Sequence, residues 1–377
     1  MADSTLDNVG RLADFDHVIV VTDVGVRTAG HLYRIGRLLE EGGVRSDVLV
    51  LMQSAAATVA GVQEIHDRLA RNSLGQFGIV ALGGGSVVDT CKVAALATRY
   101  PWLLDPVSMR AQRGLVSMVN ARRGEVPVFA VPTRFGSAAE VAPRAAIAPD
   151  PLSVRRLIVG DALVPDDVMI DLGLCGGLIL EQWMDGLFEM IFRVIGPFMV
   201  TQTSTRETDV QALTMLEEVL SLGERLVVDG RTPTIDEQAS LVELSTQTAT
   251  GPHTEGWNPV MPSWWCIQNT LMTYAGWTKG ELLRRALPIL FERIEDGATW
   301  LGSPERLALL GQGANCVKAR VVQMCKSYRA GAKAKAPPSL DYGACARETM
   351  KLWGGHPDIH RAGEEGVGGL IYDVVTA

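Results

Sequence analysis

Three consecutive glycines and a serine stand between an apolar run, residues 77–82, and a stretch with helical periodicity, residues 87–98. Glycines let a ligand approach the backbone closely, and the free N–H groups at the start of a helix attract anions. The sequence therefore predicts a phosphate-binding turn, and a tight strand-to-helix turn without a ligand is the alternative. The residues of this turn are Gly83, Gly84, Gly85 and Ser86.

A second group of polar residues interrupts an otherwise apolar segment, residues 172–200. Glu181, Asp185, Glu189 and Arg193 recur at every fourth position and would share one face of a helix. Carboxylates that lose their water need a cation, a metal ion or a proton. The stripe predicts either a functional site or a structural row that Arg193 and other basic residues neutralise. The same charges exclude a membrane span here.

His253 is the only histidine between residues 67 and 355. Its neighbours Gly251, Pro252 and Thr254 predict a loop between helices. A histidine at this place could act as a general acid or base or as a replacement metal ligand, and a loop histidine without a chemical role is the alternative.

The elements that must position these residues divide the chain in two. Short apolar runs alternate with helical patterns in the first half, and they are too apolar for a sheet with one wet face. Strand patterns nearly vanish after about residue 171, where long helical patterns take over. We therefore expect a Rossmann-like α/β domain with a parallel sheet at residues 1–171 and an all-helical domain at residues 172–377. The strand-like runs are 17–23, 46–52, 77–82 and 126–131.

Length and composition limit the classes of function. A chain of 377 residues exceeds what one hydrophobic core usually serves. The net charge of −8 disfavours nucleic acid and anionic membranes as partners. Six cysteines without a CxxC pair, and a first segment without a secretory signal, favour reduced thiols in the cytoplasm. The expected partners are a small-molecule or peptide substrate and a second copy of the chain, as in a dimer, or a companion biosynthetic enzyme.

The segment from Gly83 to Lys92, GGGSVVDTCK, resembles the GGGSxxDxxK signature of iron-dependent alcohol dehydrogenases, which share a superfamily with dehydroquinate synthases. The resemblance implies that this segment, including Asp89 and Lys92, binds the pyrophosphate of a dinucleotide. Residues 20–23 resemble the family's first strand, where a terminal acid bonds the adenosine ribose and disfavours a 2′-phosphate. Asp23 therefore implies NAD rather than NADP as the cofactor.

A second stretch, residues 132–141, is similar to the family's PTTAGTGSEV loop. This similarity implies cofactor contacts for Thr133 and Ser137. The chain departs from the pattern where Ala138 and Ala139 replace a Gly-Ser pair. The resemblance runs in order through residues 17–300.

The family's metal site is eroded in this sequence. Residues 184–189 resemble a GMDALxHxIE helix whose aspartate and histidine bind iron or zinc, but Glu189 stands in the histidine's place. The dehydroquinate synthase branch has a glutamate there, followed by a lysine that is Phe192 here. Lys279 and Trp265 occupy the positions of the two remaining histidines. We therefore expect no metal, and we expect Lys279 within salt-bridge reach of Asp185 or Glu189 because an ammonium neutralises carboxylates but has no lone pair for a metal.

These observations favour an NAD-dependent oxidoreductase that acts on an alcohol or aldehyde group in a specialised biosynthetic pathway. Its expected substrate is a small molecule or a modified peptide. Two alternatives stay open. One is a non-catalytic subunit that binds NAD or a partner and supports a companion enzyme, and the other is a dehydroquinate-synthase-like cyclase. The residues expected to carry catalysis are Lys279, His253, Asp185 and Glu189.

Overall fold

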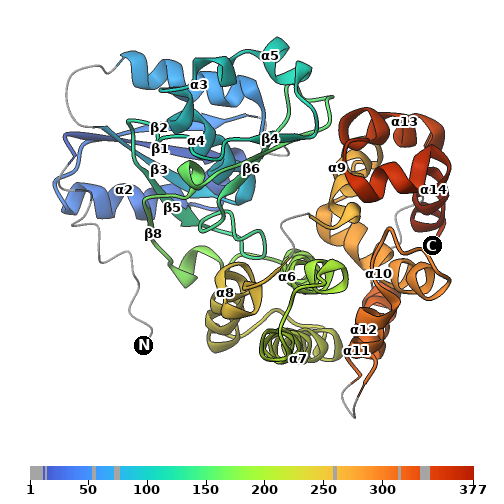
Figure 1. The fold of residues 1–377 in the computed structure, drawn as a ribbon. Coiled ribbons are helices and arrows are strands. Elements are labelled where there is room, and N and C mark those ends of the chain that lie inside the picture. Colours follow the sequence, from blue (N-terminus) through green and yellow to red (C-terminus); the bar gives the residue numbers. More distant parts are fainter. Residues whose placement is uncertain are drawn as a thin grey trace. The chain divides into compact units, whose positions relative to one another are not determined.

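A computed structural model describes residue 12 and residues 15–52, 57–71, 77–257, 261–312, 316–331 and 340–377. The chain divides into two compact units, Met1–Leu178 and Ile179–Ala377. The change in sequence pattern predicts a boundary at residue 171. Figure 1 labels the helices and strands of both units.

Parallel strands form the central sheet of the first unit, in the order β2-β1-β3-β5-β8. Side chains of one strand alternate between the two faces, so each face needs its own cover. Ile19 and Val21 pack with helices α3 and α4, while Val18 and Val20 pack with helix α2. In Figure 1, α3 and α2 accordingly lie on opposite sides of the sheet. The strands are β1 (His17–Asp23), β2 (Ser46–Leu51), β3 (Phe77–Gly83), β5 (Val128–Pro132) and β8 (Asp167–Val168).

The predicted fold class, a Rossmann-like parallel sheet followed by helices, is confirmed. A smaller three-stranded sheet, order β4-β7-β6, was not predicted, because its strands are only three or four residues long. Its strands are β4 (Leu115–Ser117), β6 (Arg144–Ile147) and β7 (Arg156–Val159). The helices of this unit are α1 (Val24–Thr28), α2 (His31–Glu41), α3 (Val59–Arg71), α4 (Gly85–Ala97) and α5 (Pro106–Ala111).

The strand order fixes where a ligand can meet this sheet. The chain runs from β1 outward to β2 and then returns to place β3 on the other side of β1. Ligands of open α/β sheets bind at such a switch point, outside the carboxyl ends of the strands. Asp23 and Gly83 are the carboxyl-terminal residues of β1 and β3. The topology therefore brings the predicted acid and the glycine turn to the same edge of the sheet.

A buried lysine fastens α4 to the segment that follows β5. Lys92 is 2% exposed, and its ammonium donates hydrogen bonds to the carbonyls of Ala139 (2.8 Å), Ala142 (2.9 Å) and Arg144 (2.6 Å). Burial lowers the pKa of Lys92, and the nearby carboxylate of Asp89 opposes this shift. Three donors on three carbonyls satisfy the ammonium.

The second unit is a bundle of helices. Helix α6 lies at its centre and is covered by α7, α8 and α10. In the part of the chain that is described, none of the helices has the length and unbroken apolar character needed to cross a bilayer. The helices are α6 (Leu180–Val200), α7 (Arg206–Asp229), α8 (Ile235–Thr250), α9 (Ser263–Ala275), α10 (Lys279–Glu295), α11 (Pro304–Leu310), α12 (Val317–Gly331), α13 (Tyr342–Trp353) and α14 (Pro357–Thr376).

Replacing Lys92 by methionine should destabilise the first unit by about 3 kcal/mol, because three buried carbonyls lose their donor. Chemical denaturation followed by circular dichroism measures this. Arg37→Met on exposed α2 is the control, since Arg37 makes a surface ion pair with Glu41 and should change stability by less than about 0.5 kcal/mol. Equal stability of the two variants would show that the ammonium does not hold this segment.

Candidate functional site

The glycine turn joins β3 to α4 in the way the sequence predicts. Gly84 is the N-cap of α4, has an extended backbone (φ −77°, ψ −178°) and offers no side chain to cap the helix. The first N–H groups of a helix have no partner within the helix, and the helix dipole adds partial positive charge there. The start of α4 is therefore suited to an anionic group.

The three glycines of the turn serve different purposes. A Cβ on Gly83 would lie 2.6 Å from Cγ2 of Val87, and a Cβ on Gly85 would lie 2.8 Å from Oγ of Ser137. Both glycines are thus required by packing alone. A Cβ on Gly84 would lie 3.5 Å from Cδ of Arg134, an ordinary contact. Packing therefore leaves room for a small side chain at Gly84.

The second predicted loop begins beside this turn. The backbone N–H of Thr133 donates to the carbonyl of Gly83 at 3.1 Å, and Thr133 is buried. Ser137 accepts a hydrogen bond from the N–H of Ala139 at 3.3 Å. Ala138, which stands where the family pattern has glycine, has a φ of 50°. The loop therefore keeps a backbone shape that glycine adopts more easily.

Asp23 lies at the end of β1 and caps the short helix α1 by accepting a hydrogen bond from the N–H of Val26 at 2.9 Å. Asp89 accepts from the N–H of Ala146 at 2.9 Å and lies 3.7 Å from the ammonium of Lys92. The resemblance to the GGGSxxDxxK signature implies that Asp89 and Lys92 bind the cofactor. Their contacts instead support a role in fastening α4 to residues 139–146.

The polar stripe of α6 separates into parts with different partners. Glu181 is exposed, whereas Asp185 and Glu189 are half-buried. Arg193 is 5% exposed and donates to the carbonyl of Ser245 (3.2 Å) and the hydroxyl of Thr248 (2.9 Å) on α8. Arg193 therefore joins two helices, and the carboxylates are the part of the stripe that meets α10.

The start of α10 supplies the partners of these carboxylates. Lys279 Nζ lies 2.9 Å from Glu189 Oε2, and the hydroxyl of Thr278 donates to Asp185 Oδ1 at 3.1 Å. The predicted salt bridge of Lys279 is confirmed, with Glu189 as its partner. Gly280 makes this geometry possible, because a Cβ there would lie 2.4 Å from the Cα of Asp185. The two helices touch backbone to backbone at this point.

The residues at this place do not fit the metal of the resembling family. A zinc or iron site needs three or four protein ligands, commonly including histidines. Among the described residues, no three His, Cys, Asp or Glu side chains are grouped so that they could hold a metal ion. Lys279 and Trp265 stand where the family has its two histidines. Lys279 forms an ion pair with Glu189, and the rings of Trp265 and Phe192 pack edge to face with their centres 6.2 Å apart. The Lys279 ammonium thus occupies the side of Glu189 where a metal ion would have to bind, and an ammonium has no lone pair for a metal.

His253 lies in a different setting from the one the sequence suggested. It is 1% exposed within a short 3₁₀ turn, Pro252–Thr254, and its ring packs edge-on against Trp257 at 5.1 Å. Burial lowers the pKa of His253, although the Thr248 carbonyl favours protonation. A neutral, enclosed ring has no open path to a substrate, so these contacts favour the structural alternative for His253.

Tyr328 on α12 is a residue that the sequence did not single out. Its ring packs at a tilt against Phe188 of α6, with ring centres 6.2 Å apart. Burial raises the pKa of Tyr328, and the nearby carboxylates of Glu181 and Asp185 raise it further. Its phenol stays protonated at neutral pH and is a potential hydrogen-bond donor beside the stripe. No spacing along the chain could reveal it, because α6 and α12 are far apart in sequence.

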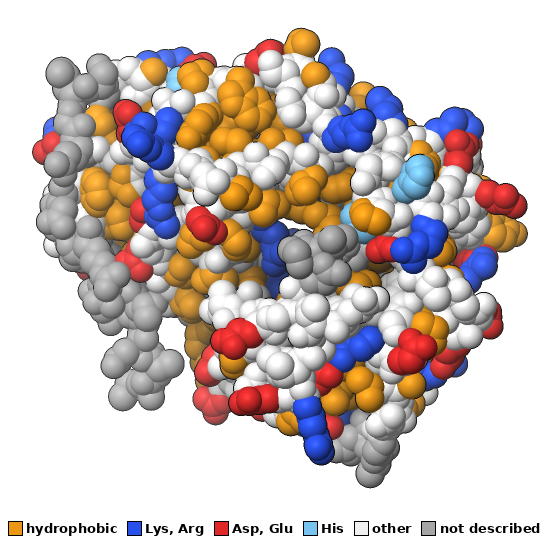
Figure 2. All heavy atoms as spheres, in the orientation of Figure 1, with side chains coloured by type: hydrophobic (Ala, Val, Ile, Leu, Met, Phe, Trp, Pro, Cys, Tyr) orange, Lys and Arg blue, Asp and Glu red, His pale blue; other side chains and the backbone are white. Residues whose placement is uncertain are grey.

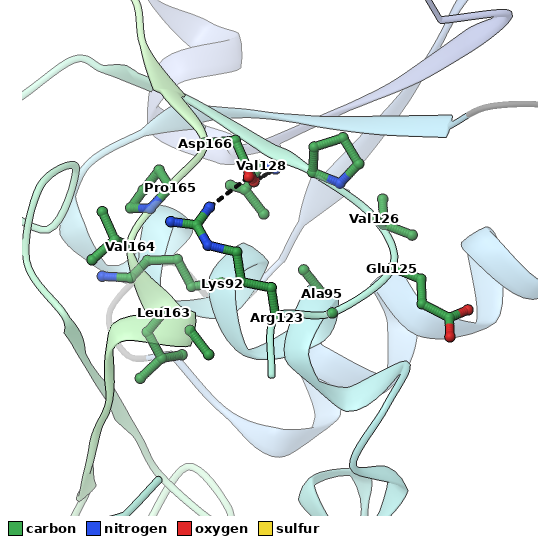
Figure 3. A pocket seen from close by; sticks show the side chains of 13 residues that line it. Lys92, Ala95, Arg123, Glu125, Val126, Val128, Leu163, Val164, Pro165 and Asp166 are labelled. Carbon is green, nitrogen blue, oxygen red and sulfur yellow. Dashed lines mark hydrogen bonds and ion pairs between the residues drawn. The ribbon is translucent and has the colours of Figure 1, made fainter. Parts of the chain in front are cut away.

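A cavity of about 230 Å³ lies elsewhere in the first unit (Figure 3). It is lined by Val128, the first residue of β5, and by Arg123 and Asp166, whose side chains form an ion pair at 2.5 Å. It therefore opens at the amino-terminal end of β5, the edge opposite the glycine turn.

The outer surface carries Lys and Arg side chains interspersed with Asp and Glu over the face drawn in Figure 2.

Gly280→Ala should destabilise the second unit by about 2 kcal/mol or more, because the new Cβ overlaps the backbone of α6 and the helices must separate. Gly368→Ala on α14 is the matched control. Its Cβ would lie 3.7 Å from the Cβ of Ala346, an ordinary contact, and alanine favours a helix by about 1 kcal/mol. Urea denaturation of both variants measures the difference. A Gly280→Ala variant as stable as the control would contradict the close helix contact.

Comparisons with known proteins agree with this architecture. Residues 2–172 match the model of the iron-containing alcohol dehydrogenase family. Alcohol dehydrogenase 4 of Saccharomyces cerevisiae is 25% identical over 186 residues, which are 47% of this chain and 45% of that protein. Lactaldehyde reductase of Escherichia coli is 29% identical over 100 residues, which are 26% of this chain and 25% of that protein. The chain thus matches less than half the length of these curated relatives.

Solved structures extend the likeness of the fold to the whole chain. NADH-dependent butanol dehydrogenase A from Thermotoga maritima has a TM-score of 0.80 at 16% identity, with 99% of this chain and 95% of that one covered. An iron-containing alcohol dehydrogenase from Thermococcus thioreducens has a TM-score of 0.73 at 16% identity, with 99% and 96% covered. Residues 2–172 of this chain are therefore similar to the iron-containing alcohol dehydrogenase family, and the chain as a whole has the fold of these solved structures.

Proposed function

We propose that this protein is an NAD-dependent oxidoreductase that acts on an alcohol or aldehyde group, in a reducing cytoplasm and within a specialised biosynthetic pathway. The observation that carries the proposal is the glycine turn at the switch point of the sheet. It presents the uncapped start of α4 at the carboxyl edge. That arrangement suits a dinucleotide pyrophosphate. The family match over residues 2–172 supports the same activity.

The residues present fit NAD. The open space at Gly84 lets a phosphate approach the backbone. Ser86 is part of the turn, and Ser137 lies in the loop next to it, where its Oγ is close to Gly85. Asp23, at the end of the neighbouring strand, would bond the ribose hydroxyls and repel the 2′-phosphate of NADP. When bound, NAD would accept the hydride that leaves the carbinol carbon as the alcohol becomes a carbonyl and releases a proton.

Lys279 is the residue best suited to the oxygen of the substrate. Its side chain is 33% exposed, and one of its three N–H donors is used by Glu189. The remaining donors could bond the oxygen and stabilise negative charge that develops on it. Glu189 holds the ammonium in place, while Asp185 fixes the start of α10 through Thr278. We assign Lys279 to catalysis without a transition metal.

Two observations are also consistent with a second function, that of a non-catalytic subunit. The metal ligands of the family are not assembled among the described residues, whereas the glycine turn is intact. A non-catalytic subunit that binds NAD and supports a companion enzyme would have this combination. The dehydroquinate-synthase-like alternative depends on the match of residues 186–191, and Phe192 stands where that branch has its lysine.

NADH binding tests the cofactor assignment. Gly84→Asp should weaken binding by about 100-fold or more, because a carboxylate beside the phosphates repels them in a partly desolvated place. Gly84→Ala is the matched control, since its Cβ makes only ordinary contacts, and it should bind nearly as well as the wild type. Titration by NADH fluorescence measures all three proteins. Equal affinity of wild type and Gly84→Asp refutes the assignment.

Elemental analysis and turnover test the metal-free mechanism. Protein purified without chelator should carry far less than one zinc or iron ion per chain. Lys279→Met should lower kcat by about 100-fold for an alcohol substrate, whereas Lys351→Met, at a lysine that is 70% exposed, should not. Near-stoichiometric metal that is lost in Asp185→Ala would overturn the mechanism. A metal-free protein that oxidises no alcohol with NAD would favour the non-catalytic subunit.

A further inference from the structure

The glycine turn supplies only part of the positive charge that a dinucleotide could use. A pyrophosphate brings two negative charges, while the start of a helix offers about half an elementary charge. The lysine nearest in sequence is Lys92. Its ammonium already donates hydrogen bonds to three carbonyls and has no donor left for a ligand. Asp23, at the neighbouring strand end, adds negative charge. A cation from another segment would therefore strengthen binding.

Arg134 is placed to supply it. The residue before it, Thr133, is tied to Gly83 through the 3.1 Å backbone hydrogen bond that aligns β5 with β3. The stem of Arg134 then lies over the turn, because a Cβ on Gly84 would be 3.5 Å from its Cδ and 3.9 Å from its Cβ and Cγ. Arg134 is exposed to solvent. The guanidinium begins one bond beyond Cδ, so it is within reach of a group seated on Gly84.

We propose that Arg134 binds the pyrophosphate of the dinucleotide and, with the start of α4, holds it from two sides. The proposal rests on the proposed NAD-binding function and adds a residue that fixes the class of ligand. A guanidinium offers planar paired donors that match phosphate oxygens, so it contributes both charge and orientation. The site takes adenosine diphosphates, including ADP and ADP-ribose, and discriminates against adenosine without phosphates.

The position of Arg134 also makes it a clean target for mutation. Its exposed side chain is not part of the hydrophobic cores of this unit, so a substitution leaves the packing of the sheet intact. Lysine keeps the charge but loses the paired donors, whereas glutamine loses the charge. The two variants therefore separate attraction by charge from recognition by geometry.

Binding of NADH, ADP-ribose and adenosine to the whole chain tests the proposal, with NADH followed by fluorescence and the others by competition. Arg134→Gln should weaken NADH and ADP-ribose by about tenfold or more and leave adenosine within about twofold. Arg134→Lys should fall between Arg134→Gln and the wild type. Arg37→Gln, on an exposed face of α2, is the control and should bind as the wild type does. Thermal unfolding of each variant checks that the fold is unchanged.

The outcomes separate this proposal from the proposed function. If the wild type binds no NADH, both are overturned. If the wild type binds NADH, Gly84→Asp does not, and Arg134→Gln equals the wild type, only the role of Arg134 is overturned. A loss of affinity for all three ligands alike would also overturn it, because recognition of phosphate predicts a loss confined to the ligands that carry phosphates.

Discussion

Half-buried carboxylates on an apolar helix must be balanced before that helix can pack, and this requirement organises the second unit. Asp185 and Glu189 lie on the face of α6 that meets α10. The start of α10 supplies a partner for each carboxylate. The hydroxyl of its N-cap residue, Thr278, donates to Asp185, and the ammonium of Lys279 forms an ion pair with Glu189. The same Thr278 hydroxyl accepts the N–H of Glu281 and caps α10. Gly280 allows the backbones to approach closely enough for these contacts.

An ammonium and a divalent metal make different sites out of the same carboxylates. A metal would neutralise both, whereas a single ammonium leaves one negative charge in excess. In the proposed mechanism Lys279 would polarise a substrate oxygen less strongly than a metal does, but an ammonium needs no histidine ligands. A neutral alcohol or aldehyde suits this environment better than an anion. The phenol of Tyr328, kept protonated beside Asp185, adds a donor without adding charge.

The sequence predicted best what depends on neighbouring residues. The glycine turn and the alternation of strands and helices are local patterns. The Lys279–Glu189 contact could be placed only because the family resemblance puts Lys279 at the position of a histidine that shares a metal with the helix carrying Asp185 and Glu189. Contacts between distant segments could not be placed in this way. The carbonyls that satisfy Lys92 lie 47 to 52 residues along the chain, and nothing in the GGGSxxDxxK pattern indicates them. The enclosure of His253 likewise depends on the packing of separate helices.

The glycine turn shows why a motif and its function have to be argued residue by residue. Gly83 and Gly85 would be glycines in any protein with this packing, because Val87 and Ser137 occupy the space of a side chain. They are therefore weak evidence for a ligand. Gly84 carries more weight, since packing tolerates a side chain there and its place at the start of α4 is where an anion would sit. The stem of Arg134 approaches that same residue, so the one glycine that packing does not explain is also the one with a cation beside it.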